Sequence, residues 1–171
     1  MMRKKITLAL VLASALVMLA ACDSGLQPTP IPTPTLAIQV TPSPDMKIVY
    51  QSSGGVAGSQ TELVIGPTGE TTLTERGTVV GTFDIGRDPV TELVKKFEAA
   101  KFFDLQDKYE KGDVVADDIY TTITYTQAGR TKTVTAAQVG GEGITPQSFL
   151  DLATQLNELA SSLGGKDKSK P

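Results

Sequence analysis

Apolar and polar residues alternate along several short stretches of the chain, and this two-residue period predicts half-buried β-strands. Glycine-containing segments such as 66–69 and 127–130 separate neighbouring stretches and are typical of turns. Short strands joined by tight turns favour an antiparallel sheet. The predicted strands are Met46–Gln51, Thr61–Ile65, Thr71–Glu75, Thr78–Ile85, Asp118–Tyr125 and Thr131–Ala137.

Two other stretches carry apolar residues at every third or fourth position, which is the period of an amphipathic helix. In the first we predict Asp88 as the N-cap and Pro89 as the first helical residue, and in the second Thr145 and Pro146. The pair Gly164-Gly165 is predicted to end the second helix. The residues at this spacing are Val90, Leu93, Val94, Phe97 and Lys101 or Phe102 in the first helix and Phe149, Leu152, Leu156, Leu159 and Leu163 in the second.

Two helices and about five or six short strands predict an α+β domain, in which both helices pack on one face of an antiparallel sheet. The other face is expected to stay in water, because Thr122, Thr124 and Thr126 occupy alternate positions of one strand. An open face or edge is also a surface on which a small domain can bind a peptide or a protein. The polar segment 107–117 is predicted to be a solvated loop.

The first 22 residues follow a different pattern. The basic run Arg3-Lys4-Lys5 precedes Leu8–Leu19, twelve residues interrupted only by Ser14, and this is the layout of a secretory signal. A transmembrane anchor is the alternative, since the uncharged stretch Ile6–Cys22 has 17 residues, at the short end for spanning a bilayer. The small pair Ala20-Ala21 directly before the cysteine favours the signal.

The sequence Leu19-Ala20-Ala21-Cys22 resembles the lipobox of bacterial lipoproteins. The resemblance implies that residues 1–21 are removed as a signal peptide and that the thiol of Cys22 carries diacylglycerol. It also implies a further acyl chain, such as palmitate, on the new amino terminus. Two or more acyl chains hold a protein stably at a membrane. The chain is therefore expected to be a lipoprotein of the cell membrane, with its domain on the extracytoplasmic side.

Residues 22–45 are expected to comprise the lipidated cysteine and a linker. Proline alternates with threonine there, a composition that favours extended polyproline II structure. At about 3.1 Å per residue, a fully extended linker would reach roughly 70 Å. A single globular domain is predicted at 46–165, and a charged, disordered tail at 166–171.

The composition excludes several kinds of chemistry. Loss of Arg3-Lys4-Lys5 with the signal would lower the formal charge from −3 to −6, and nucleic-acid binding is not expected of so acidic a chain. The chain has no His and one Cys, which excludes an intrachain disulfide, a Cys or His metal cluster and a His-dependent catalytic triad. Neither Ser53 nor Ser148 has a lysine at a spacing that suggests a Ser–Lys pair. We expect no cofactor and no enzymatic activity.

Acidic residues gather between positions 104 and 118, where they could bind calcium or act in acid–base catalysis. Lysines are interleaved with them, and the order Asp-x-Asp-x-Asp-Gly is absent. Asp117 and Asp118 would point to opposite faces of a strand. A solvated loop is favoured, and no metal is expected. The glycines at 54–55 and 140–143 could offer backbone amides to an anion, but without a following Lys-Ser or Lys-Thr they favour ordinary turns.

Three stretches together resemble the emfourin domain, whose family is named after a bacterial protein inhibitor of thermolysin-like metallopeptidases, or a related group of uncharacterised lipoprotein domains. They are Ile48–Gly58, Phe97–Leu105 and Asp118–Tyr125, of which only the Ser-Gly-Gly-x-Ala-Gly segment is distinctive. The resemblance implies a protease inhibitor. One departure is the long linker before the first strand, which would block any inhibition that needs a free terminus beside that strand.

The residues and the resemblance predict a membrane-tethered, non-enzymatic domain that binds a secreted peptidase or another envelope protein. The expected contact is a loop with Val56 as its exposed apolar tip, formed by Ser53, Gly54, Gly55, Val56, Ala57 and Gly58. A structural or envelope-associated lipoprotein with no dedicated ligand is the competing prediction. A weaker third is a hydrolase that uses carboxylates alone, which would need two acids converging in a cleft.

Overall fold

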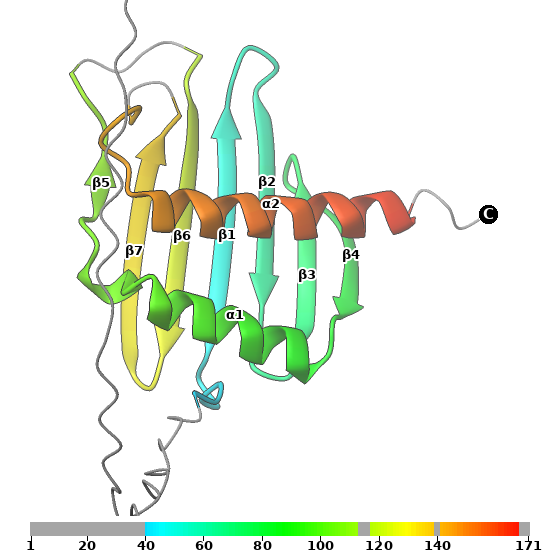
Figure 1. Ribbon diagram of the computed structural model, residues 1–171. Helices are drawn as coiled ribbons and strands as arrows, with labels where there is room; N and C mark the ends of the chain where they lie inside the picture. Colours follow the sequence, from blue (N-terminus) through cyan, green and yellow to red (C-terminus); the bar gives the residue numbers. More distant parts are fainter. Residues whose placement is uncertain (1–39, 113–116, 139–140, 168–171) are drawn as a thin grey trace, which may run out of the picture. The chain divides into compact units, whose positions relative to one another are not determined.

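The structure, a computed structural model, describes residues 40–112, 117–138 and 141–167 (Figure 1). The predicted signal peptide, Cys22 and the predicted linker up to residue 39 lie outside the described residues. So do Asp113, Gly140 and the last four residues of the predicted tail. The elements of the described residues confirm the predicted α+β class.

The strands of the described residues form one seven-stranded sheet in the order β4-β3-β2-β1-β6-β7-β5. Neighbouring strands are antiparallel except β5 and β7, which are parallel. β1 therefore occupies the centre of the sheet, with β2 and β6 on its two sides. The strands are β1 (Lys47–Gly54), β2 (Ser59–Ile65), β3 (Glu70–Glu75), β4 (Thr78–Asp84), β5 (Lys108–Tyr109), β6 (Ile119–Gln127) and β7 (Arg130–Ala137).

The helices α1 (Arg87–Ala99) and α2 (Gln147–Asp167) cross the same face of the sheet, as predicted (Figure 1). A short 3-10 helix, η1 (Phe102–Asp104), follows α1. Nearly all of the two predicted apolar stripes is buried against strand residues such as Ile48 and Leu63. None of the helices in the described part of the chain is both long enough and apolar enough to cross a bilayer.

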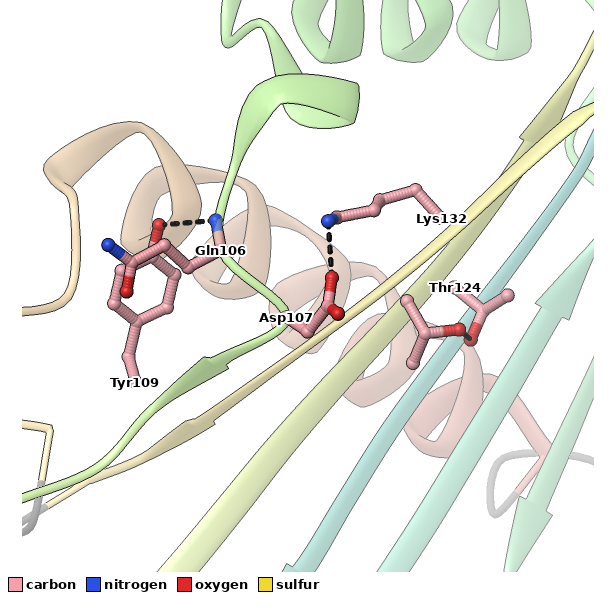
Figure 2. A network of polar contacts seen from close by, with 6 residues as sticks. Gln106, Asp107, Tyr109, Thr124 and Lys132 are labelled. Carbon is pink, nitrogen blue, oxygen red and sulfur yellow. Dashed lines mark hydrogen bonds and ion pairs between the residues drawn. The ribbon is translucent and has the colours of Figure 1, made fainter.

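The face of the sheet without helices carries a ladder of threonine hydroxyls. In each of three cross-strand pairs between β6 and β7, one hydroxyl donates to the other over 2.9 to 3.0 Å. The pair that includes Thr124 is drawn in Figure 2. The alternation of threonines on one strand thus continues across the neighbouring strand. The pairs are Thr122 and Thr135, Thr124 and Thr133, and Thr126 and Thr131.

α1 begins one residue before Asp88, so the prediction of Asp88 as N-cap and Pro89 as first helical residue was wrong. Gly86 stands at the N-cap with φ 79°, and the Asp84 carboxylate accepts its N–H at 2.8 Å. Asp88 lies in the first turn, where its negative charge interacts favourably with the positive end of the helix dipole. A tertiary contact constrains this turn, because a Cβ atom on Gly69 would lie 2.6 Å from the Gly86 nitrogen.

α2 differs from its prediction at both ends. The hydroxyl of Thr145 does not cap the helix but donates to the carbonyl oxygen of Gly141 at 2.9 Å. The helix also continues past Gly164, which was expected to end it. A Cβ atom on Gly164 would lie 3.2 Å from Glu75 Oε1 and 3.5 Å from Leu73 Cδ2. This glycine therefore lets α2 pass close over β3.

The segment predicted as a loop after the first helix contains the seventh strand, β5. The Thr135 N–H of β7 donates to the carbonyl oxygen of Asp107 at 2.9 Å, directly before β5. The Asp107 carboxylate forms an ion pair with Lys132 (Figure 2). The hydroxyl of Tyr109 accepts the Gln106 N–H at 3.0 Å. A two-residue strand is too short for alternation to reveal it. The contacts of Asp107 with Thr135 and Lys132, which place the strand beside β7, join residues far apart in the sequence.

Candidate functional site

The predicted contact loop lies at the end of the hairpin formed by β1 and β2, and we call residues 53–59 the tip. The loop proper is shorter than predicted, since Ser53 and Gly54 belong to β1 and Ser59 begins β2. Only Gly55–Gly58 form the turn. The candidate residues therefore remain together, but two of them are held in the sheet.

Gly54 brings the tip into close contact with the segment before β6. Its φ is 114°, and a Cβ atom would lie 2.1 Å from the carbonyl oxygen of Asp118. The same carbonyl accepts the N–H of Gly55 at 3.2 Å, and Gly55 has φ 72°. Both residues use the left-handed region that glycine populates without strain. The pair Gly54-Gly55 is thus explained by the positive φ angles that the turn needs and by the close approach of its backbone to that of Asp118.

Two hydrogen bonds order the turn itself. The N–H of Gly58 donates to the carbonyl oxygen of Gly55 at 2.9 Å. The hydroxyl of Ser59 donates to the carbonyl oxygen of Gly54 at 3.1 Å. These contacts close the turn across its base and leave the side chains at its end free to project.

Val56 projects from this turn into water. It is 91% exposed, more than the other exposed large apolar residues among those described, of which Val79 is 60% exposed. Ala57 beside it is also exposed. The tip carries no charged side chain. The structure therefore has a small, uncharged apolar projection at one end of the hairpin formed by β1 and β2.

Charged residues flank the tip on its two sides. Arg76, in the turn between β3 and β4, donates its backbone N–H to the carbonyl oxygen of Gln60 at 2.9 Å, which places that turn beside β2. On the other side Asp117 is exposed, with φ 82°. Asp118 is 4% exposed, and its carboxylate accepts the Ile119 N–H at 2.8 Å. The tip thus lies between the turn that carries Arg76 and the segment that carries Asp117 and Asp118.

Two of the acidic residues considered for metal binding form ion pairs with lysines in the structure. Asp107 pairs with Lys132, and Glu110 pairs with Lys108, whose pKa it raises. Among residues 40–112, 117–138 and 141–167, no group of three or more acids or cysteines is placed to hold a metal ion. Asp118 is buried at the base of the tip. The ion pairs of Asp107 and Glu110 therefore give these two acids a role within the fold.

The glycine segment after β7 was considered as an anion site. Gly141 uses its N–H to donate to the carbonyl oxygen of Ala137 at 2.9 Å. Its own carbonyl oxygen accepts the N–H and the hydroxyl of Thr145 at 3.0 and 2.9 Å. A Cβ atom on Gly141 would lie 2.3 Å from the Ala137 carbonyl oxygen. This glycine is therefore explained by tight packing, and its amide is not available to an anion.

An open groove of about 690 Å³ runs between α1 and α2, and the sequence did not signal it. Lys96 and Ala99 line it from α1, and Leu152, Gln155 and Glu158 from α2. The Lys96 amine donates to the amide oxygen of Gln155 at 2.9 Å and so bridges the two helices. Leu152 is only 3% exposed, but Ala99 and Ala100 also line the groove, so part of its lining is apolar.

A family model described as a domain of unknown function (DUF6438) matches residues 68–160, more than half of the chain. The chain belongs to the DUF6438 family. A search of curated proteins finds no match. The DUF6438 match begins after β2 and ends within α2, so β1, the tip and β2 lie outside it. It links the chain neither to emfourin nor to lipoproteins.

Proposed function

We propose that this DUF6438 protein is a membrane-anchored lipoprotein whose tip binds another protein. The observation that carries the proposal is Val56, which is 91% exposed at the end of an ordered turn. Acyl chains on Cys22 would hold the chain at the extracytoplasmic side of the membrane. No cofactor or metal takes part in the proposed activity.

The physical basis of the proposed binding is burial of a preordered apolar side chain. Burial removes apolar surface from water and gains roughly 25 cal/mol per Å². The hydrogen bonds of Gly58 and Ser59 already order the turn, so binding loses little conformational entropy. The absence of charge on the tip lets it enter an apolar pocket without the desolvation of an ion.

The partner we propose is a secreted peptidase, and thermolysin-like metallopeptidases are the first to test because of the resemblance to emfourin. In this proposal the tip and the adjoining strand ends occlude the cleft of the enzyme. Residues 40–46 precede the first strand, so inhibition would use the tip and not a free terminus. The resemblance, the exposed tip and the predicted tether support this choice.

The test is to incubate the whole chain with a panel of secreted thermolysin-like peptidases and to measure peptidase activity and complex formation by gel filtration. We expect Val56→Asp to weaken inhibition at least about tenfold, because a carboxylate would enter an apolar pocket. The matched control is Val79→Asp, another exposed valine, which lies on β4. It should inhibit like the unchanged chain.

Two results would count against this proposal. If the unchanged chain neither inhibits a peptidase nor forms a complex with one, peptidase inhibition fails. If membrane pull-downs recover the same envelope components with the unchanged chain and with Val56→Asp, the tip is not the contact. The second result would favour a structural lipoprotein with no dedicated ligand.

A further inference from the structure

The residues that lead into β1 are fastened to the turn between β6 and β7, and we call Thr41–Asp45 the clip. Ser43 donates from its N–H and its hydroxyl to Gln127 Oε1, at 3.1 and 2.9 Å. Gln127 Nε2 donates in return to the carbonyl oxygen of Thr41 at 3.0 Å. The N–H of Gly129 donates to Asp45 Oδ2 at 2.6 Å. The end of the predicted linker is thus part of the folded domain.

The clip and the tip lie at opposite ends of the same strand. β1 begins two residues after the clip, with Lys47 opposite Thr126 of β6. It ends at Gly54, in the tip, opposite Ile119. Figure 1 shows β1 running through the middle of the sheet between these two ends. Its eight residues span roughly 26 Å at about 3.3 Å per residue.

We propose that β1 is a direct mechanical link between the linker and the tip. A pull on a partner bound at the tip passes along the backbone of this one strand to the clip and the linker. The rest of the sheet carries little of the load. The use of this link in the cell rests on the proposed function, but the mechanical property belongs to the fold.

The extension of a β-strand explains why tension along β1 should not unfold the domain. A strand already approaches the maximum reach of the backbone, so a pull on its two ends hardly lengthens it. Once the clip has opened, the hydrogen bonds of β1 to β2 and β6 are not pulled apart, because neither neighbour is then held by the opposing force. The side-by-side pairing of β1 can therefore persist under load.

Tension between the linker and the turn after β6 acts differently. Both points lie at the same end of two neighbouring antiparallel strands. The β1–β6 pairs would open one after another, starting at Lys47 and Thr126 and ending at Gly54 and Ile119. Each step breaks only one or two hydrogen bonds, each of which contributes about 1 kcal/mol. This direction should unfold the domain at low load.

Single-molecule pulling on the whole chain distinguishes the two directions. Cell-free synthesis in detergent leaves the thiol of Cys22, the only cysteine, free for the first handle. The second handle is attached to Val56→Cys in one variant and to Ala128→Cys in the other, both at exposed turn positions. Circular dichroism establishes that each variant folds, and Ala57→Cys replaces Val56→Cys if that variant does not.

We expect the Ala128→Cys chain to unfold at low load. Over the same range, the Val56→Cys chain should lack the unfolding step and show only linker extension and release of the clip. An unfolding step at the same or lower load in the Val56→Cys chain would overturn the proposal. No partner protein is present, so this outcome is independent of whether the tip binds a peptidase.

Discussion

At the scale of single residues, Gly54 has two features that disfavour any larger residue, a positive φ angle and a close contact with the backbone of Asp118. Its φ is 114°, and a Cβ atom would lie 2.1 Å from the Asp118 carbonyl oxygen. We expect Gly54→Ala to lower the free energy of unfolding by about 3 kcal/mol, from backbone strain and displacement of the segment before β6. Urea denaturation measures this loss.

The matched control for this variant is Gly77→Ala, in the turn between β3 and β4. Gly77 also has a positive φ, 75°, but no heavy atom lies within 4 Å of a Cβ built there. Its substitution should cost about 1 kcal/mol, from left-handed strain alone. Equal losses in the two variants would show that the close approach to Asp118 is not what requires glycine.

Tyr125 makes the stability of the domain sensitive to alkaline pH. Its ring stacks on Phe97 with the centroids 4.3 Å apart. Burial, together with the nearby carboxylate of Glu98, raises the pKa of its hydroxyl. An unfolded tyrosine ionises near pH 10, at about its ordinary pKa, whereas the folded one stays protonated. Unfolding therefore releases a proton above that pH, and the free energy of unfolding falls as the pH rises.

This pH dependence can be measured by thermal unfolding from neutral pH to about pH 11. We expect the melting temperature to fall above about pH 10, and to fall less steeply in Tyr125→Phe, which has no group to ionise. The chain has no His, so no histidine titration complicates the neutral range. If the melting temperature of Tyr125→Phe falls as steeply at alkaline pH as that of the unchanged chain, groups other than Tyr125 cause the fall.

At the scale of elements, the sequence predicted those features of the helices and strands that depend on neighbouring residues alone. The apolar stripes of α1 and α2 and the alternation in β1 and β6 are properties of consecutive residues. The start of α1 depends instead on the approach of Gly69 to Gly86, and the length of α2 on the packing of Gly164 over Leu73. Such contacts join residues far apart in the chain, so local pattern could not reveal them.

The clip gives a prediction at the same scale. The N–H of Ala128 donates to the hydroxyl of Ser43 at 2.9 Å, so Ser43→Ala removes its acceptor. We expect amide hydrogen exchange at Ala128 to become faster in this variant, because local opening costs less there. The control is Ser59→Ala, which removes the hydroxyl bond to the carbonyl of Gly54 in the tip. Unchanged exchange at Ala128 in Ser43→Ala would show that the clip does not hold this turn.

At the scale of the whole molecule, the candidate site was predicted in part. The glycine-rich composition of 53–58 indicated a turn with an exposed valine, and the structure places Val56 in that position. The sequence did not indicate that residues 41–45 bind the turn after β6, because serine, glutamine and aspartate are ordinary surface residues until the chain is folded. The clip shows that the domain extends into the segment predicted to be linker.

The proposed cellular role of the tip depends on the predicted membrane anchor, and that anchor would rest on a single thiol. We predict that the unchanged chain partitions into the detergent phase of a phase-separating detergent and incorporates labelled palmitate. Cys22→Ser should abolish palmitate incorporation, because a hydroxyl cannot form the thioether and no second acyl attachment would compensate. Ser24→Ala, two residues away, is the matched control and should behave like the unchanged chain. Detergent-phase partitioning of the unchanged chain without palmitate incorporation would instead indicate an uncleaved transmembrane leader, since the stretch Ile6–Cys22 would then hold the protein at the membrane without acylation.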